Sequence, residues 1–141
     1  MNIEIVKKDL FTMPQGYYLA HCISADFKLG AGIAKMFDSV YNMRNKLITS
    51  NVGYNFIDGD AILIDNVFNL VTKEKYWHKP TYSSISFAIN CMADICKQRG
   101  ITKLAMPKIG CGLDKLDWDE VYDIILDAFE DLDIDIVICE L

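Results

Sequence analysis

Two glycine-bearing loops are the segments of this sequence best suited to hold a ligand through the backbone. One contains Gly30-Ala31-Gly32 and the other contains Gly110-Cys111-Gly112, and each lies between a predicted strand and a predicted helix. Glycine lacks a Cβ, so such loops turn sharply and bring backbone N–H groups against an anion. A tight turn without a ligand is the alternative for either loop alone, but two such loops suit the two ends of one diphosphate.

Four polar side chains stand near these loops or at the ends of predicted strands. Asp114 directly follows the second loop, Asp9 follows the first strand, and His21 and Ser24 lie at the end of the second. Ligand sites in open α/β sheets lie at the carboxyl ends of strands, so Asp9 is a site candidate, and Asp114 would face whatever the second loop holds. Three have ordinary structural alternatives: Asp9 as a turn cap, His21 as a packed core residue, and Ser24 as a partner for its loop backbone.

Familiar nucleotide-binding motifs are absent. No G-x-x-x-x-G-K-[ST] sequence occurs, which disfavours a P-loop ATPase. Gly30-Ala31-Gly32 lacks a third glycine and no acidic residue follows at the right distance, which disfavours a Rossmann dehydrogenase. His21 and His78 are far apart and no ligand cluster has zinc spacing, so we expect neither a metal nor another cofactor.

The elements that position these residues alternate between strand and helix. This alternation predicts an α/β fold of three layers, α/β/α, around a mixed sheet in a single domain spanning residues 1–141. Asp117 is a good helix N-cap, with Glu120 three residues later as in a capping box, so both glycine loops would lead to helix N-termini. Strands are predicted at residues 3–6, 17–22, 61–65, 67–72, 103–106 and 134–139, and helices at 33–49, 81–99 and after Asp117.

Composition limits the class of protein further. The chain has 141 residues, 52 % of them hydrophobic, which is enough for a core. Its net charge of −6 disfavours a large DNA-binding surface but not a small nucleotide site. Five cysteines with no C-x-x-C pair indicate reduced thiols, and no signal peptide or membrane-spanning run is evident. We therefore expect a cytoplasmic protein.

Six segments, in order and over nearly the whole chain, carry a family resemblance. They are Lys8-Asp9-Leu10-Phe11, Ala20-His21-Cys22-Ile23-Ser24, Gly30-Ala31-Gly32-Ile33-Ala34, Leu70-Val71-Thr72-Lys73, His78-Lys79-Pro80-Thr81-Tyr82 and Met106-Pro107-Lys108-Ile109-Gly110-Cys111-Gly112-Leu113-Asp114. The chain resembles the macrodomains, and among them the terminal ADP-ribose protein glycohydrolases, also known as O-acetyl-ADP-ribose deacetylases. The family usually has Gly before the first Asp, where this chain has Lys8.

The resemblance implies roles for individual residues. Asp9 would accept a hydrogen bond from the adenine amino group, since a carboxylate only accepts, and His21 and Ser24 would line the ribose–phosphate cleft. Lys73 is singled out as catalytic among three lysines in a segment otherwise typical of a solvated loop, with Asp114 as its partner. The other expected ADP-ribose contacts are Leu10, Gly30, Gly32, Ile33, Ile109, Gly110, Cys111, Gly112 and Leu113.

The resemblance also implies an enzyme that removes mono-ADP-ribose from modified glutamate or aspartate of proteins. Lys73 would attack C1″ of the distal ribose as a free amine, a state that Lys75, Lys79 or partial burial would favour. Asp114 would help to resolve the resulting lysyl–ADP-ribose intermediate. The same cleft would admit O-acetyl-ADP-ribose as a second substrate.

Two other functions remain open from the sequence. A non-catalytic ADP-ribose-binding module would keep the glycine loops without needing Lys73 and Asp114 together. A DNA-repairing antitoxin would instead remove ADP-ribose from thymidine, and a toxin gene would lie beside its own. In each case we expect ADP-ribose or mono-ADP-ribosylated macromolecules as partners, no membrane association, and a monomer.

Overall fold

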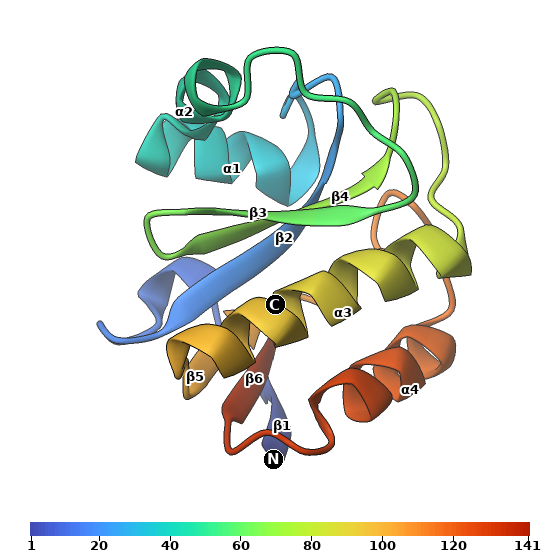
Figure 1. Ribbon diagram of the computed structural model, residues 1–141. Helices are drawn as coiled ribbons and strands as arrows, with labels where there is room; N and C mark the ends of the chain where they lie inside the picture. The colour runs from blue at the N-terminus through green and yellow to red at the C-terminus, as the bar shows by residue number, and fades with distance from the viewer.

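The computed structural model describes residues 1–141 as a six-stranded mixed sheet with helices on both faces (Figure 1). In sheet order the strands are β1 (Asn2–Lys7), β6 (Asp135–Glu140), β5 (Lys103–Met106), β2 (Tyr18–Ser24), β4 (Val67–Lys73) and β3 (Asp60–Ile64). The first five are parallel, and β3 pairs antiparallel with β4. Five carboxyl ends therefore meet at one edge, where ligand sites of such sheets lie.

Helices cover each face of the sheet. On one face lie α1 (Gly32–Tyr41), α2 (Met43–Ser50) and the short 3-10 helix η1 (Leu10–Thr12); on the other lie α3 (Tyr82–Arg99) and α4 (Trp118–Phe129) (Figure 1). Alternate strand residues divide between two cores: Val67 and Val71 pack toward α1 and α2, whereas Phe68 and Leu70 pack toward α3. The three-layer α/β/α prediction and the mixed sheet are confirmed.

Turns and caps at element ends form as the local sequence requires. Thr81 opens α3 through a reciprocal capping box with Ser84, and Gly100 ends it in the left-handed region at φ +65°. The hairpin between β3 and β4 turns through Asp65, which also has a positive φ of 54°. Neither α3, the longest helix, nor any other is long and apolar enough to cross a membrane.

The helix predicted for residues 33–49 is wrong as a single element. Asn42 adopts left-handed backbone angles, φ 54° and ψ 41°, and divides it into α1 and α2. The Asn42 N–H donates to the Asp38 carbonyl, and the Asp38 side chain accepts from the Arg44 N–H at 2.9 Å. This turn lets Phe37 and Leu47, on different helices, both be fully buried, so α1 is held with its N-terminus at the ligand edge.

Candidate functional site

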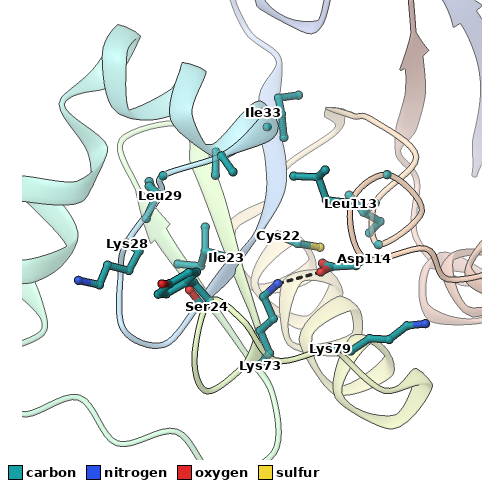
Figure 2. A pocket seen from close by; sticks show the side chains of 18 of the residues that line it. Cys22, Ile23, Ser24, Lys28, Leu29, Ile33, Lys73, Lys79, Leu113 and Asp114 are labelled. Atoms are coloured by element: carbon teal, nitrogen blue, oxygen red, sulfur yellow. Dashed lines mark hydrogen bonds and ion pairs between the residues drawn. The ribbon is translucent and has the colours of Figure 1, made fainter.

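A cavity of about 900 Å³ lies at the carboxyl ends of β2, β4 and β5. Three segments form its walls: the end of β2 with the loop leading into α1, the end of β4 with residues 76–79, and the loop after β5 (Figure 2). The two glycine loops therefore line one cavity, although more than 70 residues separate them along the chain. The parallel topology explains this, because it brings distant strand ends to one edge.

Lys73 and Asp114 form an ion pair in this cavity. The Lys73 Nζ donates to Asp114 Oδ1 at 2.8 Å, and the two side chains are only 15 % and 17 % exposed (Figure 2). Lys73 is the last residue of β4, where its backbone pairs with Ser24 of β2, so the sheet fixes its stem. Shielding from water makes such a pair stronger than a surface one, and the carboxylate is within reach of the lysine proton.

The cavity is positively charged in a protein whose net charge is −6. Its walls carry five lysines and a single carboxylate, that of Asp114. Lys108 is paired with Glu140 at 2.9 Å, but Lys28, Lys79 and Lys115 form no salt bridge. The field in the cavity therefore favours an anionic ligand.

The N-terminus of α1 adds unpaired backbone donors to this cavity. Ala31 occupies the N-cap position and makes no side-chain hydrogen bond, and Gly32, Ile33 and Ala34 of the first turn line the cavity. The first N–H groups of a helix have no partner within the helix, and the helix dipole makes this end positive. An uncapped helix end beside free lysines suits a phosphate group.

The expectation that both helix N-termini serve the ligand is wrong. Asp117 caps α4 by accepting from the Asp119 N–H at 3.0 Å, and acidic Asp119 and Glu120 occupy the first turn. No reciprocal bond from Glu120 completes a capping box. This end of α4 is thus satisfied and negatively charged, and neither Asp117 nor Trp118 lines the cavity.

The two glycines of the loop after β5 differ in their surroundings. Gly110 could not be replaced without a clash, whereas Gly112 faces open space. Gly110 has φ +74°, and an added Cβ would stand 2.5 Å from Ile85 Cδ1 and 3.1 Å from Leu116 Cδ1. Gly112 has no atom within 4 Å of such a Cβ, so it faces open space at the cavity wall. A Cβ on Gly32 would stand 3.1 Å from Leu113 Cδ1, so the two loops come close together there.

Comparison with known proteins identifies the family. The sequence profile of the Macro domain family matches residues 21–125. The chain belongs to the macrodomain family. Its relatives include the ADP-ribose glycohydrolase OARD1 of Bos taurus, at 38 % identity over 97 % of this chain and 90 % of the bovine protein, and the human protein of the same name, at 37 % over the same shares.

Solved structures place the macrodomain fold on the whole chain. The macrodomain of Thermus aquaticus DarG superposes with a TM-score of 0.87 at 19 % identity, covering 99 % of this chain and 98 % of that one. The macrodomain of Mycobacterium tuberculosis DarG gives 0.84 at 22 % identity, covering 99 % and 97 %. Thermosipho africanus DarTG in complex with ADP-ribose gives 0.74 at 20 % identity, covering 98 % of this chain and 41 % of that one.

Most of the expected site residues line the cavity of this macrodomain, and four do not. Asp9 is exposed beyond β1, where its carboxylate accepts from the Phe11 N–H and caps η1. Leu10 is buried in the core, and the half-buried Cys111 thiol donates to the Ile109 carbonyl. Those that do line it are Lys73, Asp114, Ser24, Gly30, Gly32, Ile33, Ile109, Gly110, Gly112 and Leu113.

The fourth, His21, is a core residue, which corrects the expectation that its side chain lines the cleft. It is fully buried, its ring stacks on Phe37 with centroids 3.9 Å apart, and its Nε2 lies 2.6 Å from Asn69 Oδ1. Burial lowers the pKa of His21 to about 4, although the hydrogen bond that its Nε2 gives to Asn69 acts in the opposite direction. The neutral ring therefore donates from Nε2, since the amide oxygen only accepts.

Two groups near the ion pair had not been singled out from the sequence. The Asp26 carboxylate accepts from Ser24 Oγ and from the Tyr76 N–H, which ties the loop after β2 to the loop after β4. Burial opposes its ionisation, but these hydrogen bonds outweigh burial and lower its pKa. Cys22 lies beside Lys73 and Asp114 (Figure 2), and burial, with the Asp114 charge, raises its pKa to about 12. Its thiol is therefore neutral.

Proposed function

We propose that this macrodomain is an ADP-ribose glycohydrolase that removes mono-ADP-ribose from glutamate and aspartate esters on proteins through Lys73. The observation that carries the proposal is the shielded Lys73–Asp114 pair, at 2.8 Å, inside a cavity built for an anion. A module that only binds ADP-ribose needs the loops but has no use for a lysine and carboxylate in contact. The name of the OARD1 relatives, ADP-ribose glycohydrolase, supports the same activity.

The diphosphate occupies the uncapped end of α1 and the loop after β5, within the field of the unpaired lysines Lys28 and Lys115. The distal ribose then lies toward the end of β4, with C1″ facing Lys73. Asp9 lies outside the cavity at the carboxyl end of β1 and uses one oxygen for its turn. Its second oxygen is available to the adenine amino group.

The chemistry needs one proton transfer before bond formation. Lys73 passes a proton to Asp114, leaving an amine and a carboxylic acid. The amine attacks C1″ as the ester C1″–O bond breaks, and the electron pair of that bond leaves on the carboxylate of the target side chain. Asp114 then releases its proton to solvent and, as a carboxylate, takes a proton from a water molecule that attacks C1″. The C1″–N bond breaks with its electron pair returning to the Lys73 amine, ADP-ribose leaves with the new hydroxyl, and the proton passes from Asp114 back to Lys73.

The ligand assignment predicts tight binding of ADP-ribose relative to a smaller nucleotide. ADP-ribose should bind with a free energy of roughly −7 to −9 kcal/mol, in the low-micromolar range. AMP lacks the second phosphate and the distal ribose, so it should bind much more weakly. Isothermal titration calorimetry measures both. Equal affinities would show that the cavity does not hold the diphosphate and distal ribose.

The activity is tested by measuring ADP-ribose release from glutamate-modified protein and from thymidine-modified DNA side by side. Lys73→Ala should lower turnover on modified protein by on the order of 10⁴-fold while keeping most of the ADP-ribose affinity, because a nucleophile acts in the transition state. Lys73→Arg should fail as well, since arginine stays protonated. Lys75→Ala is the matched control, because Lys75 is in the same loop and lines no cavity described here.

If Lys73→Ala retains turnover, Lys73 is not the nucleophile, and a mechanism run by Asp114 and water replaces the proposal. If the wild-type protein binds ADP-ribose but releases none from either substrate, the module is a reader. Release from DNA alone would assign it to thymidine instead.

A further inference from the structure

The loop between β4 and α3 carries two exposed aromatic residues at the mouth of the cavity. Tyr76 and Trp77 both line the cavity, yet they are 57 % and 67 % exposed. Leu113, on the loop after β5, is 74 % exposed at another wall of the same cavity. Exposed apolar side chains that gather around a cleft indicate a surface that contacts a partner, and the chemistry described above gives Tyr76 and Trp77 no role.

Hydrogen bonds hold this loop in place. The Tyr76 N–H donates to the Asp26 carboxylate at 2.9 Å, which attaches the loop to the one after β2. The His78 N–H donates to the Lys75 carbonyl at 3.0 Å, and the His78 Nδ1 accepts from the Lys75 N–H at 3.3 Å. The turn that presents Trp77 is therefore closed on itself, and a surface that is ordered before binding loses less entropy when a partner docks.

The rings of this loop stand nearly perpendicular to one another. The Tyr76 and Trp77 centroids are 5.1 Å apart with an angle of 88° between the ring planes, and those of Trp77 and His78 are 5.4 Å apart with an angle of 73°. Single-stranded nucleic acids stack successive bases on aromatic faces, whereas perpendicular rings leave a corner between them. Because Tyr and Trp provide large, rigid apolar surface at low entropic cost, this corner suits one apolar side chain.

The charges beside the aromatic pair are of both signs. Lys79 is exposed, and its amine is directed away from the Lys73–Asp114 pair (Figure 2). The exposed carboxylates of Asp58 and Glu74 line a neighbouring hollow together with Lys79. A single strand of nucleic acid carries a phosphate at each nucleotide and needs a positively charged groove, which these carboxylates interrupt. The surface outside the mouth therefore suits a polypeptide better than a nucleic acid strand.

We propose that Tyr76 and Trp77 form a docking site for the target polypeptide, where they hold an apolar side chain next to the modified glutamate or aspartate. The inference rests on the proposed function. The target is joined to the distal ribose, so its modified side chain enters the cavity and its backbone stays at the mouth. A polypeptide extends in both directions from its modified residue and therefore crosses the rim, where Trp77 is only four residues from Lys73. The two rings would determine specificity, because they contact a part of the substrate that ADP-ribose lacks.

Two peptides separate this contact from the contacts to ADP-ribose. Both carry the same glutamate-linked ADP-ribose, flanked by leucines in one and by serines in the other, and mono-ADP-ribosylated free glutamate provides the same bond without a peptide. The wild type should hydrolyse the leucine peptide with a kcat/KM about tenfold above that of the serine peptide, mainly through a lower KM. Trp77→Ala should remove this preference and leave ADP-ribose affinity and hydrolysis of the free-glutamate substrate unchanged.

The matched variants separate the aromatic contact from a general loss of structure. Trp77→Phe keeps an aromatic ring and should retain most of the preference for the leucine peptide. Phe87→Ala removes a ring that is 50 % exposed on α3 and lines neither the cavity nor the neighbouring hollow, so it should change no substrate. Trp77→Ala should unfold at nearly the temperature of the wild type, because Trp77 is mostly exposed.

Equal hydrolysis of both peptides by the wild type, or a preference that survives in Trp77→Ala, would overturn the docking site while the proposed function stands. An equal loss on the free-glutamate substrate would also overturn it, because Trp77 would then contact ADP-ribose itself. A loss confined to thymidine-modified single-stranded DNA would place a nucleobase on the rings instead. If the wild type hydrolyses none of the glutamate-linked substrates, the proposed function fails. Tighter calorimetric binding of the leucine peptide that depends on Trp77 would still support the docking site, and equal binding of the two peptides would refute it.

Discussion

The loop after β2 and the loop after β5 have the same sequence design and opposite electrostatics. Both contain two glycines separated by one residue, and both lead to a helix. The first ends at Ala31, which leaves the start of α1 uncapped, whereas the second ends at Asp117, which caps α4 with its own carboxylate. A glycine loop before a helix is therefore not sufficient for an anion site, because the residue at the N-cap decides whether the helix donors are free.

Because of this difference in capping, the two loops have different roles toward the ligand. The loop after β2 offers a positive helix end, while the loop after β5 supplies Asp114 and the close backbone turn at Gly110. Both loops therefore hold the diphosphate, but only the loop after β5 supplies a side chain that acts on the ligand. Substitutions in each loop and at each N-cap test these roles through ADP-ribose affinity and stability.

The largest expected effect is on binding, from a charge placed in the open part of the second loop. Gly112→Glu should weaken ADP-ribose binding by at least about 100-fold, since its carboxylate would fill the cavity wall and repel the diphosphate. The fold should survive, because a Cβ at Gly112 meets no atom within 4 Å. Calorimetry measures the affinity and thermal unfolding checks the fold. Gly112→Ala, which adds only a methyl group, should bind nearly as the wild type does, and normal affinity in folded Gly112→Glu would remove this loop from the phosphate site.

A smaller effect, on stability, is expected at Gly110, where the same loop packs tightly against Ile85 and Leu116. Gly110→Ala should lower the free energy of unfolding by about 1–3 kcal/mol, because the positive φ is strained for alanine and the methyl group contacts Ile85 and Leu116. Denaturant unfolding measures the change. Gly30→Ala, which has an ordinary φ and no atom near its Cβ, is the control in the other loop and should change stability little.

The smallest expected effects come from changing the N-cap residues of α1 and α4. The two substitutions should change the free energy of unfolding in opposite directions. Ala31→Ser should cap α1 and raise stability by about 0.5–1 kcal/mol, while weakening ADP-ribose binding about threefold because it engages a donor that the phosphate uses. Asp117→Ala should lower stability by about 1 kcal/mol and leave binding unchanged. A loss of affinity in Asp117→Ala, or tighter binding in Ala31→Ser, would show that α1 is not the anion-binding helix.

Sequence patterns predicted the fold well wherever apolar periodicity and the local turn residues indicate the same element boundary. Alternation of strands and helices predicted the layers, and the helix predicted at residues 81–99 agrees with α3 (Tyr82–Arg99). The helix expected at 33–49 failed because its apolar spacing is nearly continuous across Asn42. Asn is one of the few residues that adopt left-handed backbone angles, and the Asp38 carbonyl, four residues earlier, accepts its N–H. Asn42 therefore indicates a helix end, which the apolar periodicity alone does not show.

The site was harder to predict because spacing does not show where a side chain points. His21 is in β2 next to Cys22, and alternation along the strand sends the two side chains to opposite faces, so His21 enters the core and Cys22 the cavity wall. The ion pair joins residues 41 positions apart, and only the resemblance to known proteins distinguished Lys73 from the other lysines of its segment.

Trapping the lysyl–ADP-ribose intermediate tests whether Lys73 is the nucleophile. Asp114→Ala is incubated with glutamate-ADP-ribosylated protein, and borohydride is added to reduce the imine that forms when the ribose ring of the adduct opens. The product is analysed by intact mass and peptide mapping. The first step should slow but continue, because solvent can take the lysine proton. The second should stall, since no other carboxylate lines the cavity.

We expect an ADP-ribose adduct on Lys73 in Asp114→Ala, and none in the double variant that also carries Lys73→Ala. An adduct on Lys75 or Lys79 would assign the nucleophile to another lysine of the loop. No adduct, with Lys73→Ala still inactive, would contradict covalent catalysis and leave Lys73 a role in binding or electrostatics alone.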